Sequence, residues 1–217
     1  MTTDIRNYST FDKAIQFIDS LLPITTTNHK QDNQRFSPAD IISEDNLTSS
    51  EKRQSISMMR VDHSGEICAQ ALYMGQALTA RKPNLKAHLQ QAAKEEQAHL
   101  TWCHCRIKDL GGKASLLNPI WGFGAFTIGS IAGLTGDKWS LGFLAETEKQ
   151  VTKHIDTQLN VLSANDHKTR AILEQMREDE CQHADGAINL GGQELPSAIK
   201  RLMKYSAKVM TTTAKYI

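Results

Sequence analysis

The stretch EEQAH at residues 95–99 decides the fold, because it places a carboxylate and an imidazole three residues apart, on one face of a helix. The chain repeats this pattern as DECQH at residues 179–183. One more glutamate precedes each copy: Glu66 lies 30 residues before the second glutamate of the first copy, and Glu148 lies 32 residues before the matching glutamate of the second. Such a doubled pattern is typical of a carboxylate-bridged pair of metal ions inside a four-helix bundle.

Turn signals divide most of the chain into two helical hairpins of one pattern. A helix over about 50–81 meets Pro83, and the following helix, to about residue 110, meets two glycines at 111–112. In the second half, the sequence SAND at 163–166 is predicted to form the turn between two helices, and the glycines at 191–192 to end the second of them. Counted from each turn at about 1.5 Å per residue, the paired motifs reach nearly the same level. The sequence therefore predicts an all-α four-helix bundle with its ligands at one height.

The predicted metal ligands are carboxylates and imidazoles in a ratio of two to one. They are Glu66, Glu96, His99, Glu148, Glu180 and His183. Iron and manganese favour such a set, whereas zinc and copper more often take thiolates or mainly histidines. Because ligating imidazoles usually donate their other N–H to a carboxylate, we expect Asp179 to orient His99 and Glu95 to orient His183.

Three further residues near the motifs carry weaker signals. His154, six residues after Glu148, is a candidate for proton or electron delivery to the site. His63 is expected to be a supporting or solvent-facing residue, and Tyr73 either a core residue or part of the pocket lining. Cys103 and Cys105 flank a histidine but point to different faces of a helix, which argues against a separate zinc site.

Residues 114–136 contain no charged side chain and many large apolar ones, although five glycines interrupt the run. We expect a long crossover between the hairpins with an apolar helix that dips into one leaflet of a membrane or roofs an apolar cavity, in preference to a true span. Residues 196–217 carry five basic side chains and no acidic one, which suits an amphipathic helix on an anionic membrane. The alternative is a helix packed on the bundle with its lysines in water.

Composition excludes several classes of protein. A net charge of +1 over 217 residues gives no reason to expect nucleic-acid binding, and four cysteines without a framework are expected to be reduced thiols. The first twenty residues resemble neither a secretory signal nor a mitochondrial presequence. We expect residues 1–49 to form a short N-terminal helix at about 9–22 and a mobile arm without chemistry, and residues 50–217 to form one metal-binding domain.

The run RVDHSGE at 60–66, together with both motifs and the segment from Glu148 to His154, resembles the demethoxyubiquinone hydroxylases from about residue 50 onward. This resemblance implies a ferritin-like fold, two iron ions per chain held by the six ligands, and dioxygen as co-substrate. It implies hydroxylation of the ring of a polyprenylated methoxy-methyl-benzoquinol in ubiquinone biosynthesis. His154 matches a histidine of the family, but Ile155 stands where some members have tyrosine.

The family is peripheral to membranes, which implies the cytoplasmic face of a bacterial cell membrane for this chain. We expect the apolar segment from Leu116 to Leu144 to guide the isoprenoid tail, with Phe126 and Leu134 among its contributors. A homo-oligomer or a lipid-presenting partner is left open. The rival functions are iron storage or buffering without catalysis, and another di-iron oxidase.

Overall fold

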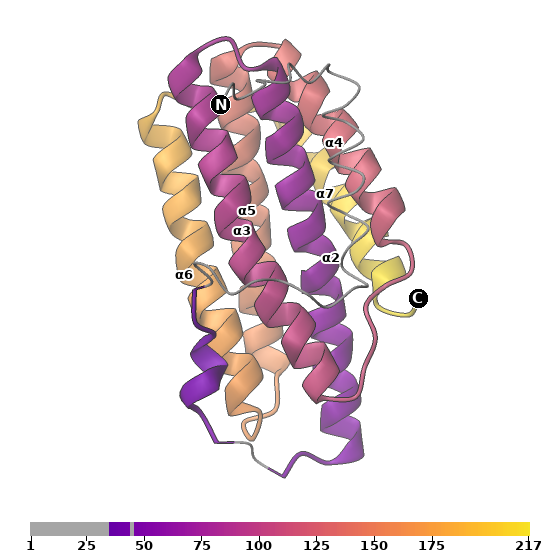
Figure 1. Ribbon diagram of the computed structural model, residues 1–217. Helices are drawn as coiled ribbons and strands as arrows, with labels where there is room; N and C mark the ends of the chain where they lie inside the picture. Colours follow the sequence, from indigo (N-terminus) through magenta and orange to yellow (C-terminus); the bar gives the residue numbers. More distant parts are fainter. Residues whose placement is uncertain (1–34, 44–45) are drawn as a thin grey trace, which may run out of the picture. The chain divides into compact units, whose positions relative to one another are not determined.

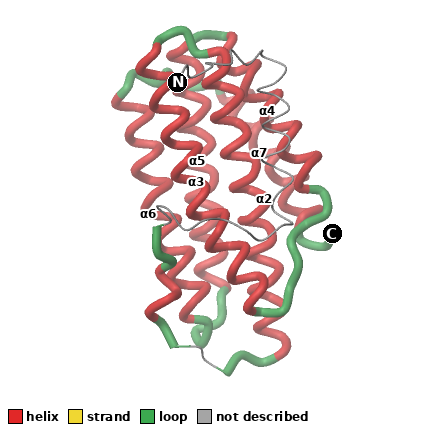
Figure 2. Tube along the Cα trace, in the orientation of Figure 1, coloured by secondary structure: helices red, strands yellow, loops and turns green. Residues whose placement is uncertain are grey.

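The computed structural model describes residues 35–43 and 46–217, and Figures 1 and 2 show helices and connections but no strand in this part. The predicted helix at about residues 9–22 lies outside the described residues. The elements in order are η2 (Pro38–Ile41), α2 (Ser49–Thr79), α3 (Pro83–Asp109), α4 (Asn118–Leu134), α5 (Asp137–Val161), α6 (His167–Asn189) and α7 (Ser197–Ala214). Residues 35–217 form one compact unit, and the predicted boundary between residues 49 and 50 stays a prediction.

Four long helices, α2, α3, α5 and α6, form the predicted bundle (Figure 1). Short connections make α2 with α3 and α5 with α6 into hairpins, and the hairpins meet through α3 with α6 and α2 with α5. Buried apolar side chains from all four helices, including Met59, Trp102, Ile155 and Met176, form a core cluster between them. The all-α bundle of two hairpins is therefore confirmed.

The predicted helix stops are confirmed, and the two have the same geometry. Gly111 and Gly191 adopt positive φ angles of 80° and 94°, a conformation that favours glycine. At the first stop the amide N–H of Gly112 donates to the carbonyl of Ile107 at 2.8 Å. At the second, Gly192 donates to Ala187 at 3.0 Å. The repeat in the sequence thus corresponds to a repeat in local structure.

Polar contacts at the helix starts tie the two hairpins together at one end of the bundle. Thr48 and Glu51 form a capping box at the start of α2, and Glu51 also accepts a hydrogen bond of 2.6 Å from Ser163 in the turn of the second hairpin. Asp166 caps α6 and forms a buried ion pair of 2.8 Å with Arg106 of α3. These contacts fix the relative height of the hairpins, on which the alignment of the ligands depends.

The apolar segment between the hairpins contains one unbroken helix, α4, where the sequence predicts an apolar crossover helix. Four glycines lie inside α4, and the small residues Gly122, Ala125, Gly129 and Gly133 face the bundle. A Cβ atom at Gly129 would lie 2.1 Å from the carbonyl oxygen of Leu72 in α2, so the two backbones touch there. Glycine is required for that approach and does not break the helix.

The large apolar side chains of α4 point the opposite way, toward solvent. Ile120, Phe123, Ile131 and Leu134 are each about 60% exposed. This arrangement inverts the usual pattern of a helix on a globular protein, whose large apolar residues face the core. No helix in the described part of the chain has the length and apolar character needed to cross a membrane.

Candidate metal centre

The structure brings all six predicted ligands together in the bundle core. Two groups of four side chains have ligand atoms within 4.8 Å of one another: Glu66, Glu96, His99 and Glu180 in the first, and Glu96, Glu148, Glu180 and His183 in the second. Glu96 and Glu180 belong to both groups. Each group alone could hold a metal ion, and the two shared carboxylates could serve both ions.

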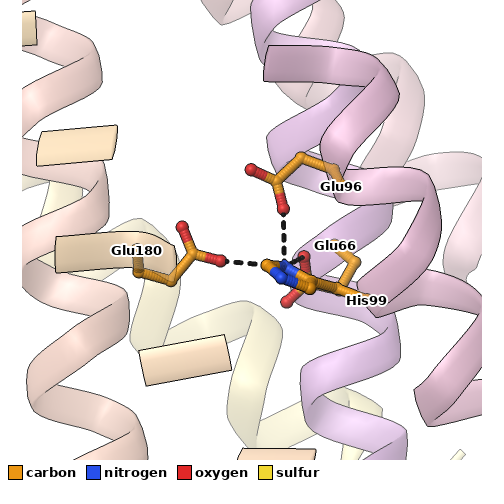
Figure 3. Close-up of side chains that lie close together, drawn as sticks. All are labelled: Glu66, Glu96, His99 and Glu180. Atoms are coloured by element: carbon orange, nitrogen blue, oxygen red, sulfur yellow. Dashed lines mark hydrogen bonds and ion pairs between the residues drawn. The ribbon is translucent and has the colours of Figure 1, made fainter. Parts of the chain in front are cut away.

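Figure 3 shows the first group, in which the His99 ring lies among three carboxylates from three helices. Its Nδ1 atom lies 3.1 Å from Glu96 Oε2, 3.2 Å from Glu180 Oε1 and 3.6 Å from Glu66 Oε2. All four side chains are almost fully buried. The spacing of three residues within the first motif therefore acts as predicted, because Glu96 and His99 face one point.

The second group mirrors the first. His183 Nδ1 lies 3.3 Å from Glu96 Oε1 and 3.4 Å from Glu180 Oε2, so each shared glutamate directs one oxygen toward each histidine. Glu148, fully buried on α5, completes this group. The second histidine is less buried than the first, with 14% of its side chain exposed against 1% for His99. One half of the site is thus closer to solvent than the other.

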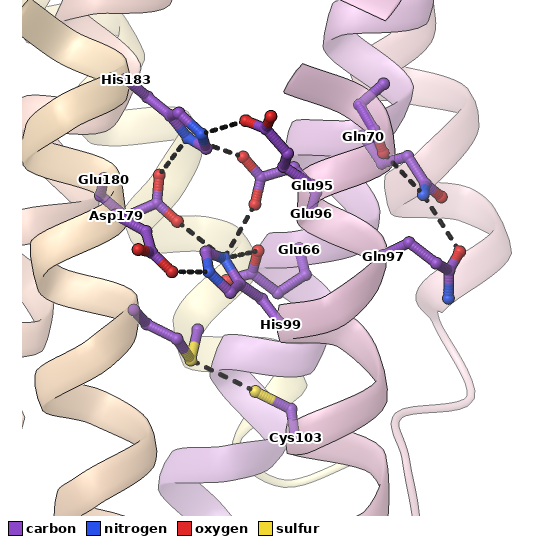
Figure 4. Close-up of polar contacts among 12 residues, drawn as sticks. Glu66, Gln70, Glu95, Glu96, Gln97, His99, Cys103, Asp179, Glu180 and His183 are labelled. Carbon is purple, nitrogen blue, oxygen red and sulfur yellow. Dashed lines mark hydrogen bonds and ion pairs between the residues drawn. The ribbon is translucent and has the colours of Figure 1, made fainter. Parts of the chain in front are cut away.

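Both histidines are oriented by the predicted outer carboxylates (Figure 4). His99 Nε2 lies 2.9 Å from Asp179 Oδ2, and His183 Nε2 lies 2.9 Å from Glu95 Oε2. A carboxylate at Nε2 keeps the proton on that nitrogen and leaves the Nδ1 lone pair facing the cluster. The predictions for Asp179 and Glu95 are confirmed, and Nδ1 is identified as the atom available to a metal.

The donor set fits a pair of hard cations. Several buried ligand atoms have no hydrogen-bond partner among the described residues, including both carboxylate oxygens of Glu148, one oxygen each of Glu66, Glu96 and Glu180, and Nδ1 of His183. Leaving one buried polar atom unpaired costs roughly 1–3 kcal/mol, and here the unpaired atoms converge on one small volume. Cations at that point would satisfy these lone pairs together.

The electrostatics of the cluster lead to the same conclusion. Burial raises the pKa of Glu66 and of Glu148 well above their ordinary range. Burial alone would also raise the pKa of Glu180, but its close contacts with the imidazoles of His183 and His99 outweigh it and lower that pKa. Burial lowers the pKa of His183, but its close contacts with Glu180 and Glu96 outweigh burial and raise that pKa to about 12. Four carboxylates so close together can all ionise only where positive charge lies among them.

The residues just before Glu66 anchor neighbouring helices around it. Asp62 accepts a hydrogen bond of 2.9 Å from Gln158 of α5. Ser64 donates to Asn118 Oδ1, at the start of α4, at 2.7 Å, and the Asn118 amide lies 3.2 Å from His63 Nδ1. His63 is fully buried, so it is a supporting residue and the solvent-facing alternative is wrong. This part of α2 thus positions Glu66 and fixes two other helices against it.

The remaining predicted residues lie outside the ligand groups. His154 Nε2 lies 3.9 Å from Asp62 Oδ1, and 40% of the His154 side chain is exposed. Tyr73 is fully buried as a core residue, and its hydroxyl has no partner among the described residues. Cys103 is buried against Met176 whereas Cys105 is exposed, so the two thiols do point to different faces. All four cysteines are free.

Arg35, which belongs to the arm expected to carry no chemistry, contacts the site, so that expectation is wrong. Its guanidinium pairs with Asp179, the carboxylate that orients His99. The sequence around it is polar and without period, and its partner lies 144 residues away. Nothing local in the sequence indicates the contact.

Comparison with known proteins gives a consistent result along nearly the whole chain. Residues 53–214 match the model of the family described as ubiquinone biosynthesis protein COQ7. A relative from Nitrosococcus oceani is 50% identical over 212 residues, which cover 98% of this chain and 99% of the relative. Relatives from Acinetobacter baylyi and Coxiella burnetii are each 48% identical over 217 residues. All three are named 3-demethoxyubiquinol 3-hydroxylase.

The match includes all six clustered side chains and both outer carboxylates. It reaches from residue 53, in the second turn of α2, to the end of α7, so it also covers α4 with its outward apolar face. The chain belongs to the ubiquinone biosynthesis protein COQ7 family.

Proposed function

We propose that this chain hydroxylates the ring of a polyprenylated demethoxyubiquinol, with dioxygen as co-substrate, at a centre of two iron ions. The proposed ligands are Glu66, Glu96, His99, Glu148, Glu180 and His183. The observation that carries the proposal is the division of these side chains into two groups of four that share Glu96 and Glu180. The names of the relatives supply the reaction.

The side chains have distinct tasks in this proposal. Glu96 and Glu180 each direct one oxygen to either half of the site and so would contribute a ligand to both ions. Glu66 and Glu148 each complete one half. Iron bound to a carboxylate-rich set of this kind supplies the redox chemistry that dioxygen activation needs. Burial of the cluster excludes water, which protects the reaction from side products.

We assign proton delivery to His154. Its side chain reaches solvent, and its Nε2 atom faces Asp62, which lies one helical turn before Glu66 on α2. Burial raises the pKa of Asp62 to about 7, against the hydrogen bond from Gln158 that lowers it, so this carboxyl can take and release a proton near neutral pH. Replacing His154 with glutamine should slow turnover while both irons remain bound.

We further propose that the chain binds to the cytoplasmic face of a membrane through α4 and α7. The outward face of α4 presents large apolar side chains, and its inward face packs through small residues, as membrane helices often do. On α7 the apolar residues Leu202, Tyr205 and Val209 are also exposed, and both helices pack against α2. A substrate with an isoprenoid tail would be collected from such a surface.

Basic residues near these helices fit an anionic membrane surface. A groove where α7 ends is lined by Arg53, Arg60, Lys113 and Lys215, and no acidic residue contributes to it. Basic residues close to an anionic leaflet each favour binding by about 1 kcal/mol. The alternative that α7 packs on the bundle with its lysines in water stays open, because α7 contacts α2 and α5 and its residues Ile199, Met203 and Met210 are half-buried.

The reaction is tested by extracting quinones from a strain that lacks this protein. Accumulation of the demethoxy precursor, and its disappearance when the wild-type chain is restored, is the expected result. Restoration with Glu180→Ala should leave the precursor in place, whereas restoration with the exposed neighbour variant Glu178→Ala should not. An unchanged quinone pool in the deletion strain would refute the proposal and would favour the iron-storage alternative.

A further inference from the structure

The segment before η2 reaches the metal centre through one side chain. Arg35 Nη1 pairs with Asp179 Oδ2, and Arg35 Nη2 donates to Asp179 Oδ1 at 3.2 Å. The same Oδ2 atom lies 2.9 Å from Nε2 of His99. The planar guanidinium thus holds both oxygens of the carboxylate whose orientation determines where the imidazole points.

Arg35 is itself held in place from the bundle. The indole N–H of Trp102 donates to the Arg35 carbonyl oxygen at 3.2 Å, and the Arg35 guanidinium lies over the Trp102 ring at 5.1 Å. The same indole packs against the His99 ring at 5.2 Å between centroids. Trp102 therefore contacts both Arg35 and His99. Through these contacts the segment before η2 is attached to this half of the site.

The other half of the site has no such support. Glu95, the carboxylate that orients His183, is 46% exposed in its side chain. It accepts a hydrogen bond of 2.9 Å from Gln91, and within the described part of the chain no arginine or lysine forms an ion pair with it. By contrast, 12% of the Asp179 side chain is exposed. The two halves, alike in their ligands, differ in how firmly the histidine is held.

We propose that Arg35 is a positioning residue for His99 and makes the metal position next to His99 the tighter of the two. The inference rests on the proposed metal centre. A ligand already held in its binding orientation loses less freedom when the metal binds, so affinity rises. The positive charge of Arg35 acts in the opposite direction, but it is neutralised by direct pairing with Asp179. Orientation is therefore the dominant effect.

The test uses the full-length protein loaded with Fe(II) without oxygen and challenged with increasing concentrations of a chelator. Wild-type protein should release its two irons in two steps. In Arg35→Gln the second iron should be released at a chelator concentration about tenfold lower than in the wild type, which is the lower end of the range for residues that orient ligands. The concentration that releases the first iron should not change. Arg35→Lys keeps the charge but loses the planar guanidinium. It should release the second iron at a chelator concentration between those of the wild type and Arg35→Gln.

Arg177→Gln is the matched control. Arg177 lies on α6, like Asp179, and forms an ion pair with Asp156 in which the arginine is 48% exposed, close to the 49% of Arg35. This pair does not involve the ligand groups, so both release steps should stay where they are in the wild type.

The role of Arg35 would be overturned if Arg35→Gln released both irons at the wild-type chelator concentrations. It would also be overturned if Arg177→Gln shifted the release as much as Arg35→Gln does. A wild-type chain that holds no iron would instead refute the metal centre itself. Should the glutamine variant fail to fold, the lysine variant decides, because unchanged release of the second iron in it would show that the planar guanidinium is not needed.

Discussion

Glu95 Oε2 and His183 Nε2 lie 2.9 Å apart, on the side of the imidazole that faces away from the ligand cluster. We predict that Glu95→Ala weakens the binding of one iron by about 10- to 100-fold, because His183 then loses the contact that fixes its proton and its orientation. Chelator competition on the Fe(II)-loaded protein measures this effect. Glu95→Gln, whose amide oxygen can still accept from Nε2, should lose much less. Equal losses in both variants would show that the negative charge matters more than orientation.

The contact between α4 and α2 predicts a sharp difference between two glycines of one helix. A Cβ atom at Gly129 would lie 2.1 Å from the Leu72 carbonyl oxygen, whereas one at Gly124 would meet nothing within 4 Å. Gly129→Ala should therefore lower the free energy of unfolding by about 1–3 kcal/mol. Gly124→Ala should leave it unchanged or raise it by up to about 1 kcal/mol. Denaturant titration of both variants checks this, and similar midpoints for the two would contradict the close packing of α4.

Asp62 predicts a dependence of stability on pH. Because burial raises its pKa from 3.8 to about 7 in the folded protein, the folded state binds more protons than the unfolded state between these values. The contribution of this group to stability is therefore greatest at low pH and is lost as pH rises through about 7. From pH 5 to pH 8, the free energy of unfolding of Asp62→Asn should therefore rise relative to that of the wild type by on the order of 2–3 kcal/mol.

Unfolding of wild type and Asp62→Asn at both pH values measures this difference, and other titrating groups cancel in the comparison. Asp109→Asn, a change at an exposed acid of α3, is the control and should follow the wild type. A difference that does not change between pH 5 and pH 8 would contradict the raised pKa.

The outward face of α4 predicts an effect on membrane binding that leaves the metal centre intact. Leu134→Asp places a charge on a residue that is 64% exposed and outside the ligand groups. Binding to vesicles that contain anionic lipid should fall, and so should turnover of a long-tailed quinol, while iron content stays at the wild-type level. Gln90→Asp, at an exposed polar position of α3 away from this face, is the control for added charge. Unchanged vesicle binding by Leu134→Asp would count against α4 as a membrane contact.

Much of the site could be predicted because its chemistry repeats at helical spacing. Glu96 with His99, and Glu180 with His183, need one turn of helix to meet, and the matched turns and glycine stops set their height. The partners Asp179 and Glu95 followed from the same reasoning, since each directly precedes a ligand. Local rules of helix geometry sufficed for all of these residues.

Two features could not be obtained in that way. Arg35 reaches Asp179 across 144 residues of sequence, and a polar segment without period gives no sign of where it will pack. In α4 the sequence predicts an apolar helix but not the use of its glycines: Gly129 and Gly133, four residues apart, form a stripe on one face. Whether glycine breaks a helix or lets it approach a neighbour depends on the neighbour, here the carbonyl of Leu72.

The most direct test of the metal centre is the iron content of Glu180→Ala compared with wild type. Glu180 belongs to both ligand groups, so its loss affects both metal positions at once. After loading with Fe(II) and removal of excess metal, the wild type should hold two irons per chain, the variant less than one, and the exposed control Glu178→Ala two. A Glu180→Ala chain that keeps two irons and full hydroxylation of demethoxyubiquinol would contradict the assignment of the site.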